Sequence, residues 1–64
     1  MNRKEIKKFT NSEVMMVNTN DFIQYGIIES VSTDTTRIKT PNGNIAILNK
    51  DIKFIKDIVV RWNK

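Results

Sequence analysis

The chain of 64 residues contains no cysteine and no histidine, and it has only two glycines and one proline. Without cysteine it can form neither a disulfide nor a thiolate metal site, so the redox compartment is undetermined and the cytoplasm is the default expectation. Without histidine, the commonest general base and a frequent metal ligand are missing. Two glycines are too few for a glycine-rich phosphate loop. We therefore expect no enzyme, no catalytic residues, no metal and no cofactor.

Length and charge set further limits. We expect a single domain over residues 1–64, and a domain of this size buries only about 60% of its unfolded surface. Such a fold is marginal alone, so pairing with a copy of itself or with a partner would help. The net charge of +4, from 11 basic and 7 acidic residues, is compatible with nucleic acid or an acidic partner. No apolar run approaches the ~20 residues that span a bilayer, and no secretion signal is expected, so we predict no membrane contact.

The strongest local signal is the turn sequence Pro41-Asn42-Gly43, which lies between two β-prone runs at residues 36–40 and 44–48. Proline presets φ for the first turn position, asparagine suits the second, and glycine can adopt the positive φ that closes the loop. This pattern predicts a β-hairpin.

Two registers are open for this hairpin. A two-residue loop at 42–43 would place Ile38 opposite Ile47, whereas a three-residue loop at 41–43 would place Ile38 opposite Ala46. The first register needs an N–H at position 41, which proline lacks, so turn chemistry favours the second. The strand after the turn is apolar on both faces.

A short helix is predicted before the strands. Asn2 followed by Glu5 is a capping-box pattern, and Ile6 and Phe9 then share one helical face. We expect the helix to run from about Asn2 to Phe9, and the alternative is a frayed basic tail over residues 1–10.

The rest of the chain predicts three more strands, at residues 13–17, about 22–32 and about 54–60. In the long second strand, Ile23, Tyr25 and Ile27 alternate on one face and Gly26 indicates a bend or bulge. A short turn at 51–53 precedes the last strand, and a C-terminal helix over 51–61 is the alternative. The predicted core comprises Ile6, Phe9, Val14, Met16, Phe22, Ile27, Val31, Ile38, Ile47, Leu48, Ile55 and Ile58.

This order of elements resembles the Sm-like and SH3-like small β-barrels. The stretch 26–32, Gly-Ile-Ile-Glu-Ser-Val-Ser, followed by Thr36-Arg37-Ile38, is similar to the first Sm motif, and residues 49–55 look like the turn into the last strand of such barrels. The resemblance covers residues 13–60 and implies a mainly β fold, a five-stranded barrel with a short N-terminal helix. It implies no RNA site, because the usual polar pair would fall near Thr35 and Thr36, with neither Asp nor Asn in register.

Two functions remain as expectations, and both are non-catalytic. The first is binding of RNA or single-stranded DNA, in which basic residues hold phosphate and aromatic rings stack on bases. The residues expected to carry it are Arg3, Lys4, Lys7, Lys8, Tyr25, Arg37, Lys39, Lys53, Arg61 and Trp62.

The second is binding of another protein. The chain resembles the small accessory proteins of phage and mobile elements of AT-rich genomes, which modulate a host enzyme. One continuous basic face would favour nucleic acid, whereas scattered charge with an apolar patch would favour a protein partner. Excess apolar side chains on the strands at 14–17 and 45–48 also predict a homodimer or a larger ring.

Overall fold

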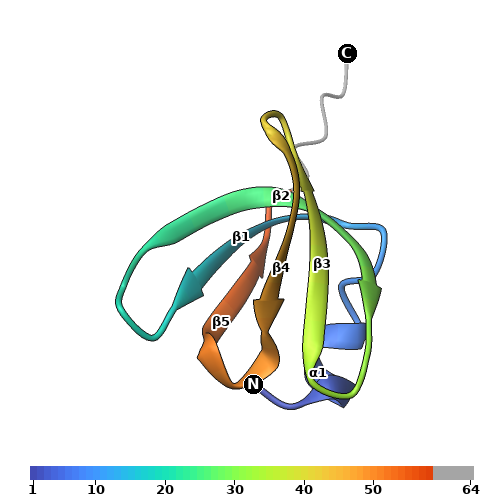
Figure 1. Ribbon diagram of the computed structural model, residues 1–64, viewed down its shortest axis with the longest axis vertical. Helices are drawn as coiled ribbons and strands as arrows, with labels where there is room; N and C mark the ends of the chain where they lie inside the picture. The colour runs from blue at the N-terminus through green and yellow to red at the C-terminus, as the bar shows by residue number, and fades with distance from the viewer. Residues whose placement is uncertain (59–64) are drawn as a thin grey trace.

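The computed structural model describes residues 1–58, which form one short helix, five strands and a single 3-10 turn (Figure 1). The elements are α1 (Arg3–Lys7), β1 (Glu13–Asn18), β2 (Ile23–Val31), β3 (Thr35–Thr40), β4 (Gly43–Leu48), η1 (Asn49–Asp51) and β5 (Ile52–Asp57). The strands build one antiparallel sheet in the order β4-β3-β2-β1-β5. No helix in this part of the chain is long and apolar enough to cross a membrane.

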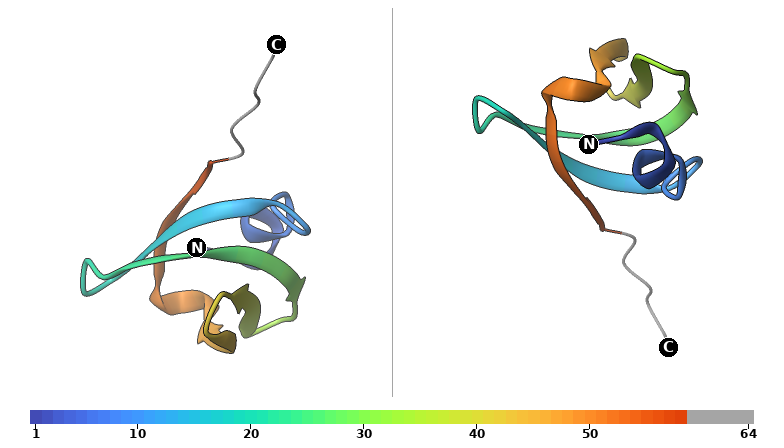
Figure 2. Two further views of the ribbon diagram at one scale, coloured as in Figure 1. Left: turned by 90° about the horizontal axis from the view of Figure 1, so that it is seen from above. Right: turned by 90° about the horizontal axis from the view of Figure 1, so that it is seen from below.

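The prediction of a mainly β fold with five antiparallel strands and an N-terminal helix is confirmed. Closure of the sheet into a barrel is not found: within residues 1–58, β4 and β5 are the two edges, and no ladder joins them. Figure 2 shows the curved, open sheet from two ends. The alternative of a helix after residue 51 is wrong for the described residues, because β5 begins directly after η1.

The capping box that the sequence predicts is present at the start of α1. The Asn2 side chain accepts a hydrogen bond from the Glu5 N–H at 2.9 Å, and the Glu5 carboxylate accepts one from the Asn2 N–H at 3.4 Å. The short helix gains its remaining stability by packing, because Ile6 is fully buried against the interior of the sheet. The alternative of a frayed tail is therefore wrong.

The β3–β4 hairpin adopts neither of the two registers considered from the sequence. Thr40 pairs with Gly43, so the loop consists of Pro41 and Asn42, and Ile38 lies opposite Ile45. Gly43 has a φ of 122°, which places the positive φ after the two turn residues. The Thr40 side chain contributes as well, because its hydroxyl donates to the Gly43 carbonyl at 2.6 Å. Proline thus keeps the first turn position without having to supply an N–H to the ladder.

Gly26 determines which face of β2 points inward. A Cβ atom at this position would lie 2.5 Å from Cγ2 of Ile38 and 2.6 Å from the carbonyl oxygen of Lys39, so only glycine allows β3 to pack this closely. The irregularity expected at Gly26 occurs instead at Glu29, where the β2–β3 register shifts. Ile28, on the same face as Gly26, is therefore fully buried.

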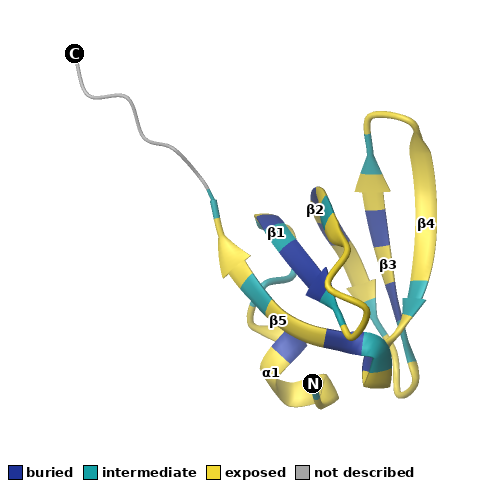
Figure 3. Cartoon of the chain, turned by 90° about the vertical axis from the view of Figure 1, so that its left-hand side faces the viewer, coloured by how far each residue is buried: buried dark blue, intermediate teal, exposed yellow. Residues whose placement is uncertain are grey.

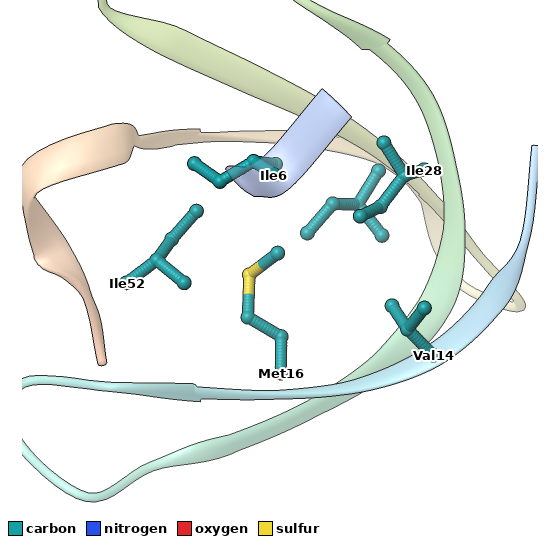
Figure 4. Packing of buried hydrophobic residues seen from close by; sticks show 6 residues of the cluster. Ile6, Val14, Met16, Ile28 and Ile52 are labelled. Carbon is teal, nitrogen blue, oxygen red and sulfur yellow. The ribbon is translucent and has the colours of Figure 1, made fainter. Parts of the chain in front are cut away.

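The core lies between α1 and the concave face of the sheet (Figure 4), which we call the interior face. Of the predicted core residues, four are fully or almost fully buried, and Phe9, Val31, Ile47 and Ile55 pack against them partly buried. Three predictions are wrong, because Phe22, Ile27 and Leu48 are exposed, while Ile58 is half-buried. The sequence prediction also missed Ile28 and Ile52, which complete a buried cluster with Ile6, Val14, Met16 and Ile38.

A buried polar network closes one end of the sheet. The Thr36 hydroxyl donates to Oδ1 of Asn49 at 2.6 Å, and the Asn49 amide donates to the carbonyls of Ser32 and Thr33 at 3.0 and 3.1 Å. Thr36 and Asn49 are both buried, so these bonds replace the water that the groups lose on folding. The network joins β3, the β2–β3 turn and η1.

We predict that Ile28→Ala lowers the free energy of unfolding by about 2–5 kcal/mol, because it removes a fully buried side chain and leaves a cavity. Ile27→Ala is the matched control: the neighbouring side chain is 40% exposed, and its loss should cost much less. Urea unfolding of both variants measures the difference. Equal losses would contradict the assignment of the two faces of β2.

We also predict that Asn49→Ala costs about 1–3 kcal/mol, since the buried Thr36 hydroxyl loses its partner. The half-buried hydrogen bonds to the Ser32 and Thr33 carbonyls are lost as well. Asn44→Ala on the exposed side of the hairpin is the control and should change stability by less than about 0.5 kcal/mol. The double variant with Thr36→Val should cost less than the sum of the two single variants. Strict additivity in denaturant unfolding would show that the network does not act as a unit.

Candidate interaction surface

The convex face of the sheet, which we call the exterior face, carries apolar side chains in register across three strands. Val17 of β1 lies directly opposite Ile23 of β2 on one side and Phe54 of β5 on the other. In the next row, Met15 lies opposite Tyr25. Directly opposed residues of an antiparallel pair project to the same face, so these side chains form one surface.

We call this surface the exterior patch and define it as Met15, Val17, Ile23, Tyr25, Ile27 and Phe54. Four of its side chains are widely accessible: Ile23 is 55% exposed, Tyr25 53%, Phe54 44% and Ile27 40%. Val17 is only 7% exposed although it lies on the outer face, because its cross-strand neighbours cover it. The patch is therefore a packed apolar surface rather than a set of isolated side chains.

Charges of both signs surround the exterior patch. Lys56 lies opposite Met15, while Glu13 and Lys39 lie opposite Ile27 on its two sides. At the far end, Lys53 forms a salt bridge of 2.8 Å with Asp21. Both partners of that bridge are more than half exposed, so solvent screens it and it contributes little to stability.

The basic residues that the sequence analysis proposed for nucleic-acid binding do not form one face. The exposed cations of α1 and of its C-cap, which are Arg3, Lys4, Lys7 and Lys8, belong to the segment that packs on the interior side of the sheet. Tyr25, Arg37 and Lys39 project from the exterior side.

Lys53 lies near the helix group. It lines a shallow depression between α1 and β5 together with Glu5, Lys8 and Phe54, the last of which belongs to the exterior patch. Arg61 and Trp62 lie outside the described residues. The structure thus separates the predicted site residues into a helix group and an exterior group, with Lys53 of the edge strand β5 between the two.

The described residues contain no cluster of three or more carboxylate, imidazole or thiol side chains that could hold a metal ion. A second depression, beside the N-terminus, is lined by Arg3, Asp34 and Lys50 among others. Comparison with known proteins finds no matching family model, no matching curated protein and no matching solved structure.

Sequence reasoning missed the exterior patch because it assigned Ile27 to the core. Of the two faces of β2, the face with Ile23, Tyr25 and Ile27 is the more hydrophobic, and hydrophobic periodicity alone places such a face inside. The signal that points the other way is Gly26. A glycine within a strand indicates a close approach of another backbone, and here that approach occurs on the interior face.

Proposed function

We propose that this chain is a non-catalytic protein-binding module that docks through the exterior patch. The observation that carries the proposal is the register, which joins the exposed apolar side chains of β5 and β2 across the less exposed Met15 and Val17 of β1 into one continuous surface. Contiguous exposed apolar surface of this kind is typical of interaction sites, because leaving it in water is unfavourable.

The composition of the patch favours a protein partner over nucleic acid. Four of its six side chains are aliphatic or thioether groups, which do not stack on bases as aromatic rings do. The surrounding charge is mixed in sign, because Glu13 of β1 is acidic whereas Lys56 of β5 and Lys39 of β3 are basic. A partner with an apolar centre and a polar rim of mixed charge fits this surface.

A role as an accessory protein of a phage or mobile element, modulating a host protein in the cytoplasm, extends this proposal. Its support comes from the small size, the lysine-rich composition and the lack of cysteine. The docking surface described above provides a means of binding that needs no catalytic residue.

We predict that the tagged chain captures a protein from a lysate of a bacterium with an AT-rich genome, and that nuclease treatment does not reduce this capture. Ile23→Lys should weaken binding of the purified partner at least tenfold, because it removes an apolar contact and places a charge in the patch. Isothermal titration calorimetry measures the affinity, and circular dichroism checks that the variant is folded.

Charge reversal of the helix group by Lys4→Glu and Lys7→Glu is the control, and it should leave the affinity within about twofold. The proposal is contradicted if this control abolishes capture while Ile23→Lys has no effect. Loss of capture on nuclease treatment would likewise contradict it, because the partner would then be bound through nucleic acid.

Single-stranded nucleic acid, either RNA or DNA, is a second candidate ligand, favoured by one observation. Tyr25 is half exposed on the exterior face, and Lys39 and Arg37 project from the same face of the sheet. A ring and cations on one face form the combination that holds bases and phosphates of a single strand.

For this second candidate we predict that affinity for labelled single-stranded oligonucleotides falls by about 0.7 log unit per log unit of salt for each phosphate neutralised. Tyr25→Ala should weaken binding without changing that slope, whereas Arg37→Ala should lower the slope. Fluorescence anisotropy over a range of salt concentrations measures both quantities. No binding at low salt would exclude this ligand class.

The likeness to Sm-like and SH3-like small barrels stays a proposal about the fold class. It is supported by the order of elements, in which a helix, a strand, a long bent strand, a hairpin and a 3-10 turn precede the last strand. The open edge between β4 and β5 in the described residues is the feature that departs from a closed barrel.

A further inference from the structure

The two edges of the sheet differ in how well they are protected against pairing with another strand. β5 carries three charged residues, Lys53, Lys56 and Asp57, and its ladder with β1 contains an irregularity. Charges and irregularities of this kind block edge-to-edge association. β4, with the sequence Gly-Asn-Ile-Ala-Ile-Leu, contains neither a charge nor a proline. β4 is thus the edge that is open to a further strand.

The backbone groups of β4 that point away from β3 can be deduced from its register. The Asn49 N–H donates to the Asp34 carbonyl at 2.8 Å, and bonded and non-bonded pairs alternate along an antiparallel ladder. Ile47 and Ile45 therefore bond to β3. The groups of the intervening residues, Asn44, Ala46 and Leu48, face outward from the sheet.

The side chains of β4 also lack cover. Ile45 lies opposite the fully buried Ile38, on the interior face, and yet it is 37% exposed. Leu48, on the exterior face, is 45% exposed. Figure 3 shows β4 exposed along nearly its whole length, in contrast to β3 beside it. A strand added at this edge would cover side chains as well as backbone.

We propose that a second copy of this chain pairs its own β4 with this edge, antiparallel about a two-fold axis at Ala46. In this register Ala46 lies opposite the partner's Ala46, and Asn44 lies opposite the partner's Leu48. Each such pair exchanges two hydrogen bonds through the groups that face outward.

The interior side chains support the same register. Ile45 lies opposite the partner's Ile47 at the closer, non-bonded positions of the ladder, so the exposed Ile45 packs against a partly buried apolar side chain of the partner. The strand is suited to pairing with itself because it carries no charge that would face its own copy. The small Ala46 side chain stands beside the two-fold axis, directly opposite its own copy.

The test uses the absence of cysteine from the chain. In the proposed register the Cα atoms of Ala46 and the partner's Ala46 are about 5.5 Å apart, within the ~4.4–6.8 Å that a disulfide spans. Ala46→Cys should therefore form a covalent dimer under mild oxidation, which denaturing gel electrophoresis without reductant detects. Asn44→Cys is the matched control. In the proposed register position 44 lies opposite position 48 of the partner, so the two introduced thiols are four residues apart, roughly 14 Å along the strand. This variant should therefore stay uncrosslinked.

Charged substitutions at Ala46 test the same pairing without a covalent bond. By sedimentation equilibrium, the unmodified chain should have twice the mass of its 7.5 kDa monomer at tens of micromolar. Ala46→Lys and Ala46→Glu should each be monomeric alone and should form a mixed dimer when combined, because opposite charges then meet on the axis. Ile23→Lys, which adds the same charge on the exterior patch, should remain a dimer.

The proposal is overturned if the unmodified chain is a monomer up to 100 micromolar, or if both cysteine variants crosslink equally, as random collision would produce. It is also overturned if Ile23→Lys dissociates the dimer while the Ala46 variants do not, since the copies would then meet through the exterior patch. The proposal is likewise overturned if this chain is a monomer whose β4 edge pairs with a strand of a different protein.

Discussion

The close approach of β3 to Gly26 is the constraint on which the rest of the structure depends. Because no side chain fits between Gly26 and Ile38, the face of β2 that contains the glycine must point inward, and Ile28 goes with it. The opposite face, which includes Ile23 and Tyr25, must then point outward. One missing Cβ atom thus places the more hydrophobic face of the longest strand on the outside, where it forms part of the exterior patch.

The small interior explains why so much apolar surface remains exposed. A single short helix contributes Ile6 to the core, and the polar pair Thr36 and Asn49 closes the end of the sheet through hydrogen bonds rather than through apolar packing. Residues 1–58, the part of the chain that the structure describes, place no second layer over the convex face, because their one helix packs on the interior side. In the interactions proposed above, other chains cover the exterior patch and the open edge at β4.

The two proposed interactions use different physical means and different surfaces. The exterior patch offers apolar side chains from three strands, whose burial would drive association with another protein. The β4 edge offers unpaired backbone groups, which recognise a strand by its register and need little side-chain complementarity. A dimer joined at β4 would place two exterior patches on one continuous sheet, so a partner with two matching surfaces would be bound at both.

The sequence by itself determined the local elements. The capping box at Asn2, the turn at Pro41-Asn42 and the run of β-prone segments act over a few residues, and such short-range chemistry is readable from the chain. Only the tertiary structure decided the faces and the register. The pair Ile27-Ile28 is apolar on both sides, so its periodicity is ambiguous, and contact with Ile38 from a distant strand selected which of the two is buried. The separation of the basic residues into two groups was likewise decided by the side of the sheet on which α1 packs, a long-range contact that residue spacing does not encode.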